Sequence, residues 1–171
     1  MNTIVTETGS DESTRWTPNR EGLIFNEFIS TWKEGDYEVD DTLIKKVSNE
    51  ASQILSKCVD PKNINLEKNS TTGLVIGQVQ SGKTLSMTAV TAMAKDNGFG
   101  IVIVMSGNVT TLSSQTAERF EQALEGRNTI KIKNNPENTW SLEDNLSNAK
   151  AIIENFNETK NPEDRSTLLV I

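Results

Sequence analysis

The stretch "GLVIGQVQSGKT", residues 73–84, decides the fold of this chain. Its apolar part, residues 74–76, is typical of a strand. Residues 77–84 then follow the pattern of Gly, four residues, Gly, Lys and Thr, which marks a phosphate-binding loop between a strand and a helix. The run from Thr84 to Lys95 contains no helix breaker, and Asn97-Gly98 after it is a helix C-cap signal. The sequence therefore predicts a strand, a glycine loop and a helix in direct succession.

The predicted roles of the loop follow from its chemistry. Glycine at positions 77 and 82 allows backbone conformations and a close ligand approach that a side chain would block, so successive N–H groups can surround a phosphate. The positive end of the following helix faces the same phosphates. We expect Lys83 to reach the β- and γ-phosphates and the Thr84 hydroxyl to bind Mg²⁺. The predicted nucleotide-binding residues are Gly77, Gln78, Val79, Gln80, Ser81, Gly82, Lys83 and Thr84.

Two helices are predicted before this unit. Apolar residues recur at helical spacing in 23–32, and a turn signal follows at 34–36. Asp40-Asp41 offers an N-cap to a second helix, whose apolar face runs as far as Cys58 and which should stop near Asp60-Pro61. Residues 1–19 contain few apolar side chains, and we expect them to form a flexible tail.

Strands and helices alternate in the second half of the chain. Residues 101–105 are apolar on both faces, as in a parallel strand covered by helices. Further elements are predicted as a helix at 112–124, a strand at 129–133, a helix from a capping box at 141–144 to about Phe156, and a strand at 167–171. This order predicts an α/β fold, a doubly wound parallel sheet with right-handed crossovers. The expected organisation is a tail at 1–19, a helical appendage at 20–61 and a nucleotide-binding domain at 62–171.

One part of a working nucleotide site is missing from the sequence. Such sites use an acidic residue at the end of a neighbouring strand, which holds Mg²⁺ through water. Here residues 101–105 are followed by Ser-Gly-Asn, and the last strand ends the chain at Ile171. We therefore expect the chain to be an incomplete phosphate-loop domain from a longer protein, or else a degenerate binding module.

Composition excludes several classes of function. The net charge of −7 argues against a strongly basic nucleic-acid binder. Histidine is absent, so imidazole bases and histidine metal sites are excluded, and the single cysteine, Cys58, cannot form an internal disulfide. No run is apolar and long enough to suggest a membrane span, and the N-terminus does not have the order of a signal peptide. A cytoplasmic protein without a membrane partner is the expectation.

The phosphate-loop region also resembles a known family. "GLVIGQVQSGKT" is preceded by "ILSKCVDP" and followed by "IVIVMSGNVTTLSSQTAERF", and together these segments are similar to the N-terminal part of the Z1 domain family, bacterial endonuclease-like proteins related to superfamily 2 helicase ATPases. The specific elements are "VQSGKT" and, further along, "SQTAER". The resemblance covers roughly residues 54–120. It implies a RecA-like ATPase core, Mg²⁺ and ATP as ligands, and action on DNA in defence against phage, together with other defence proteins.

The resemblance further implies a nucleic-acid contact. In helicase relatives the loop after the second strand touches a nucleic-acid strand, which here points to Gly107, Thr110, Thr111, Gln115 and Arg119. Gln115 and Arg119, four residues apart on one helix, are equally consistent with a solvated face. No combination of carboxylates and lysine has the spacing of a nuclease metal site. Two other functions remain open: an interaction module without catalysis, and a small-molecule kinase or GTPase of the same fold.

Overall fold

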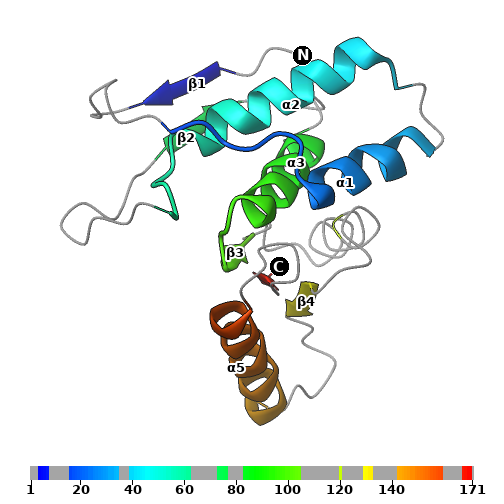
Figure 1. The fold of residues 1–171 in the computed structure, drawn as a ribbon. Helices are drawn as coiled ribbons and strands as arrows, with labels where there is room; N and C mark the ends of the chain where they lie inside the picture. The colour runs from blue at the N-terminus through cyan, green and yellow to red at the C-terminus, as the bar shows by residue number, and fades with distance from the viewer. Residues whose placement is uncertain are drawn as a thin grey trace. The chain divides into compact units, whose positions relative to one another are not determined.

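The structure, a computed structural model, describes residues 4–7, 16–34, 39–62, 73–76, 83–104, 120, 129–132, 142–159 and 167–170. The chain forms two compact units, residues 1–98 and residues 99–171. The first contains β1 (Ile4–Glu7), α1 (Leu23–Glu34), α2 (Asp41–Leu55), β2 (Gly73–Ile76) and α3 (Lys83–Asp96), and the second contains β3 (Ile101–Ile103), β4 (Thr129–Ile132), α5 (Leu142–Glu158) and β5 (Thr167–Val170) (Figure 1). The division after residue 98 differs from the boundary expected near residue 61, because α1 and α2 pack against α3.

The core of the first unit lies where α1 and α2 meet α3. The helix α3 is rich in small residues, and Ala89, Ala92 and Met93 are fully buried. Small side chains let neighbouring helices approach closely, because the distance between helix axes depends on the side chains at the contact. Against these lie further buried apolar side chains from the other two helices, namely Ile24, Phe25 and Phe28 of α1 and Val47 and Leu55 of α2. Burying one such large apolar side chain stabilises the fold by about 1.5–3 kcal/mol.

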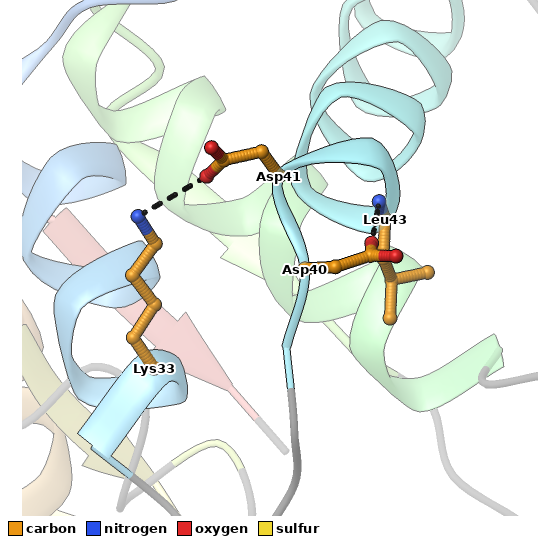
Figure 2. A network of polar contacts seen from close by, with 4 residues as sticks. All are labelled: Lys33, Asp40, Asp41 and Leu43. Atoms are coloured by element: carbon orange, nitrogen blue, oxygen red, sulfur yellow. Dashed lines mark hydrogen bonds and ion pairs between the residues drawn. The ribbon is translucent and has the colours of Figure 1, made fainter.

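The start of α2 is fixed by its own sequence. Asp40 has extended backbone angles, φ −85° and ψ 160°, and its Oδ1 accepts a hydrogen bond of 2.7 Å from the N–H of Leu43 (Figure 2). This geometry confirms the predicted N-cap. Lys33, near the end of α1, lies 3.6 Å from the carboxylate of Asp41 in the first turn of α2 (Figure 2). The Asp41 side chain is 85 % exposed, so solvent weakens this ion pair.

Replacing Asp40 with alanine is expected to lower the free energy of unfolding by about 1 kcal/mol, because the Leu43 N–H loses its acceptor. Asp41→Ala is the matched control, since it removes a carboxylate from the adjacent position, and with it the exposed ion pair and a favourable charge in the first turn, but no described acceptor of a backbone N–H. We expect that control to change stability by less than about 0.5 kcal/mol. Urea unfolding followed by circular dichroism would measure both variants, and equal losses would contradict the assignment of Asp40 as the cap.

The start of α1, in contrast, is capped from another helix. The Gly22 carbonyl accepts a hydrogen bond of 3.0 Å from the N–H of Asn26, so the residue at the N-cap position has no side chain. No acidic residue occurs in the first turn of α1. The carboxylate of Asp96, the last residue of α3, accepts hydrogen bonds from the N–H groups of Ile24 at 3.1 Å and Phe25 at 2.8 Å. Asp96 therefore holds the end of α3 against the beginning of α1.

This half-buried carboxylate gives the protein a specific pH dependence. Burial raises the pKa of Asp96 above its ordinary value of 3.8, and the two backbone hydrogen bonds and the charge of Lys95 offset that rise in part. The folded protein then binds the Asp96 proton more tightly than the unfolded chain does. The resulting stability is present below the unfolded pKa and is lost as the pH rises through the folded pKa.

We therefore expect the wild-type protein to lose stability relative to Asp96→Asn as the pH rises from about 3 to about 6. Urea unfolding of both proteins across this range gives the difference directly. Because all other carboxylates are common to the two proteins, their titration cancels. A difference that grows in favour of the wild type with rising pH would contradict the raised pKa.

The segment before α1 is held by a buried amide. The side chain of Asn97 is only 1 % exposed; its Oδ1 accepts from the N–H of Asn19 at 2.8 Å, and its Nδ2 donates to the Asn19 carbonyl at 3.0 Å. Trp16 Nε1 donates to the carbonyl of Cys58 at 2.9 Å. Together with strand β1, these contacts differ from the flexible tail expected for residues 1–19. Polar composition averaged over the segment did not reveal that single residues within it have partners far along the chain.

The described strands form two sheets, one in each unit. In the first, β1 pairs with β2 antiparallel, with Ile4 opposite Ile76 and Glu7 opposite Gly73. In the second, β3, β5 and β4 are parallel with β5 in the centre, and Ile101 and Ile130 both align with Leu168. The single doubly wound sheet containing both halves remains a prediction.

The strand β3 departs from its expected burial. Ile101 and Ile103 are 48 % and 65 % exposed, whereas Val104 just after the strand is 7 % exposed. The prediction that both faces of this strand are covered is therefore wrong for the face that carries Ile101 and Ile103. An apolar run indicates a preference for burial, but it does not specify which element covers each face.

Helix α5 packs against β5 and β4, and its residue Ile152 is 2 % exposed. The predicted helix at 112–124 lies outside the described residues apart from Phe120, which is fully buried. Within the part of the chain that the structure describes, no helix combines the length and apolar character needed to cross a bilayer.

Candidate nucleotide-binding site

The phosphate-loop pattern spans the interval between a strand and a helix. Strand β2 ends at Ile76, one residue before the pattern begins, and α3 begins at Lys83. Lys83 and Thr84, the last two residues of the pattern, are thus the first two residues of α3. Six predicted binding residues lie outside the described residues: Gly77, Gln78, Val79, Gln80, Ser81 and Gly82. The bounds of β2 and α3 agree with the local context that the pattern requires.

The N-terminus of α3 has the general properties of an anion site. The first four N–H groups of any α-helix have no acceptor inside the helix, and the helix dipole adds partial positive charge at the same end. No acidic residue occurs in the first turn of α3 to occupy these groups. A phosphate placed before Lys83 would therefore meet free donors and a favourable field.

The other end of α3 is firmly held, which makes the helix a rigid support. Asp96 and Asn97 bind the start of α1 and the segment before it, as described above. Gly98 has φ +94°, a left-handed conformation that favours glycine, and its N–H donates to the Lys95 carbonyl at 3.1 Å. The predicted C-cap at Asn97-Gly98 is confirmed. The contacts at its C-terminus and the packing of α1 and α2 against it therefore hold α3 within the first unit.

A buried carboxylate lies beside the first turns of α3, and the sequence interpretation missed it. Glu50 of α2 is 8 % exposed, and its Oε2 accepts a hydrogen bond of 3.4 Å from the hydroxyl of Ser86, which is 6 % exposed. Glu50 follows Val47 by three residues and precedes Ala51, so it lies on the face of α2 that contacts α3. The sequence did contain a signal for this residue, because a charged side chain at an apolar position of a predicted helix is unusual.

The remaining predicted contacts are not within the described residues. This applies to the proposed nucleic-acid set Gly107, Thr110, Thr111, Gln115 and Arg119. Among the residues that the structure describes, no group of three or more His, Cys, Asp or Glu side chains is arranged to hold a metal ion. The Cys58 thiol lies 3.8 Å from the carbonyl of Ile54, and burial raises its pKa, so the unreactive protonated form is favoured.

Comparison of the chain with protein-family models, curated proteins and solved structures found no match. The relation to the Z1 domain family therefore remains a hypothesis that rests on the quoted motifs.

Proposed function

We propose that this chain is the nucleotide-binding segment of a helicase-like bacterial ATPase that acts on DNA, with ATP and Mg²⁺ as its ligands. The observation that carries the proposal is the match of residues 77–84 to the phosphate-loop pattern, combined with a strand that ends at Ile76 and a helix that begins at Lys83. The resemblance to Z1 domains supplies DNA as the substrate class and phage defence with partner proteins as the context. A cytoplasmic location is also proposed, from the sequence features given above.

The chain's own groups would contribute binding rather than bond breaking. The ammonium of Lys83 would neutralise phosphate charge, and free N–H groups at the start of α3 would donate to phosphate oxygens. The Thr84 hydroxyl is a hard oxygen ligand of the kind that Mg²⁺ prefers. Bound Mg²⁺ would supply further neutralisation of the phosphates. No carboxylate directly follows residues 101–105, so we expect weak nucleotide binding and no appreciable turnover by this chain alone.

Calorimetric titration of the chain with ATP, GTP and a nonhydrolysable ATP analogue, each with Mg²⁺, tests this proposal. ATP and its analogue should bind with similar affinity, and GTP more weakly. Rapid Mg²⁺-dependent hydrolysis would contradict the assignment as a binding segment, and a preference for GTP would favour the kinase or GTPase alternative. Failure of all three to bind would overturn the nucleotide site itself.

A second function, an interaction module, is favoured by a separate observation. Apolar side chains on two strands are exposed, with Leu74 of β2 at 60 % and Ile103 of β3 at 65 %. Neighbouring exposed apolar side chains are typical of surfaces that bind other proteins, and Ile101, two residues before Ile103 on the same face of β3, is also exposed. Purification of a stable complex whose formation is unaffected by Lys83→Ala would favour this alternative over a nucleotide-dependent ATPase.

A further inference from the structure

Residues 16–20, which we call the strap, lie beside the C-terminal ends of α2 and α3 and form neither helix nor strand. The Trp16 indole N–H donates to the carbonyl of Cys58, just after α2. The amide of Asn97, directly after α3, bonds to both the N–H and the carbonyl of Asn19. A residue in a neighbouring strand pairs with main chain in the same two-bond manner, so Asn97 recognises the backbone of the strap.

The end of the strap is bound by α2. Arg20 donates from Nε to the Ser52 hydroxyl at 3.0 Å and from Nη1 to Asn49 Oδ1 at 2.6 Å. Ser52 and Asn49 are three residues apart on α2, so they share one face of the helix. Pro18, between the anchoring residues, is buried. Proline fixes its own φ and favours an extended conformation at Thr17, which lowers the entropy that the segment loses on binding.

The start of α1 does not depend on the strap. The carboxylate of Asp96, from α3, accepts from the N–H groups of Ile24 and Phe25. Helix α1 also buries Phe25 and Phe28 in the core. The strap contacts, in contrast, include single hydrogen bonds, and each such bond contributes about 0.5–1.5 kcal/mol, or about 1.5–3 kcal/mol with a charged group. The strap can therefore leave its site at a lower free energy than unfolding of α1 requires.

We propose that the ends of α2 and α3 form a peptide-binding site that the strap occupies as a detachable ligand of the same chain. The contacts define the ligand class, an extended segment in which tryptophan precedes arginine by four residues. A tethered segment has an effective concentration of the order of millimolar, so the strap excludes a free peptide until it is released. The inference is independent of the proposed nucleotide site, because none of these residues belongs to the pattern at 77–84.

The test uses a fluorescent peptide with the sequence of residues 16–21 and blocked ends, titrated into the full chain and followed by anisotropy. Trp16→Phe combined with Arg20→Ala removes two donors from the strap and leaves the site unchanged. We expect the peptide to bind this double variant at least about tenfold more tightly than wild type, whose site is filled. Adding Asn49→Ala should weaken the peptide about tenfold, because its arginine loses an acceptor. Gln53→Ala, an exposed amide on α2, is the matched control and should change affinity less than about twofold.

Equal peptide affinity of wild type and the double variant would overturn the inference. Absence of binding to the double variant at millimolar peptide, the order of the effective concentration of a tethered segment, would do the same. A loss no larger for Asn49→Ala than for Gln53→Ala would show that the peptide binds elsewhere, which also contradicts the proposed site. Thermal unfolding shows that each variant is folded before its affinity is compared.

Hydrogen exchange of the wild-type protein in low urea tests detachment without any substitution. The Asn19 N–H, which donates to Asn97, should have a protection factor at least about tenfold lower than the Phe25 N–H, which donates to Asp96. Its exchange should also depend less on urea, because opening of the strap exposes less surface than unfolding does. The same protection and the same urea dependence at both positions would show that the strap leaves only when α1 unfolds, and the site would not be available to a ligand.

Discussion

Replacing Lys83 with alanine should weaken binding of Mg²⁺-ATP by about a hundredfold or more. Lys83 is the first residue of α3, directly after the segment expected to surround the phosphates. Its ammonium can donate charge-assisted hydrogen bonds to phosphate oxygens, and such bonds contribute about 1.5–3 kcal/mol each. Alanine leaves that phosphate charge uncompensated, and a loss of about 2.7 kcal/mol corresponds to a hundredfold change in the dissociation constant.

Calorimetry with Mg²⁺-ATP measures this effect, and Lys33→Ala is the matched control. Lys33 is also a helix lysine, but it lies at the end of α1 and its only described ion pair is with the exposed Asp41. Its loss should leave nucleotide affinity unchanged. Equal affinity of Lys83→Ala and wild type would remove the phosphate loop as the binding site, provided that both proteins melt at similar temperatures.

The helices of the first unit could be predicted closely because their signals are local. The apolar spacing in residues 23–32 and the cap at Asp40 lie within the elements they define. The end of α3 was likewise marked by Asn97-Gly98, because a left-handed glycine after a helix is a property of the adjacent backbone. For the same reason, the strand before the phosphate loop and the helix after it were found at nearly their observed bounds.

Contacts between distant positions could not be predicted in this way. Asn97 binds the backbone of Asn19, and the antiparallel partner of β2 is β1. Each of these contacts depends on how segments that are distant in the sequence pack together. Nothing in the sequence distinguishes the residues that form them from other polar residues or other strand residues. The location of Glu50 could be predicted only in part. Its place on an apolar helix face was visible in the sequence, but its proximity to the first turns of α3 follows only from the packing of α2.

The second prediction with a large effect concerns stability and tests one of these distant contacts. Gly22→Ala should lower the free energy of unfolding by about 2–4 kcal/mol, although the substitution adds a single methyl group. A Cβ atom at position 22 would overlap the side chain of Asp96. To avoid this overlap, the carboxylate must leave the position in which it accepts from the N–H groups of Ile24 and Phe25. Both donors then lose a charged acceptor at a helix end that has no cap of its own.

A double-mutant cycle separates this mechanism from the ordinary preference for glycine at an N-cap. In an Asp96→Gly background every side-chain atom that the new methyl group would strike, the Cβ atom included, is gone, and the hydrogen bonds are already lost. Gly22→Ala should then cost no more than about 0.5 kcal/mol, the usual difference between glycine and alanine at a cap. Gly73→Ala is a second control, because a Cβ atom there would meet nothing within 4 Å. The cycle is measured by urea unfolding. If the losses in unfolding free energy of the two single variants add up in the double variant, Gly22 and Asp96 act independently, and the proposal that Asp96 caps α1 is contradicted.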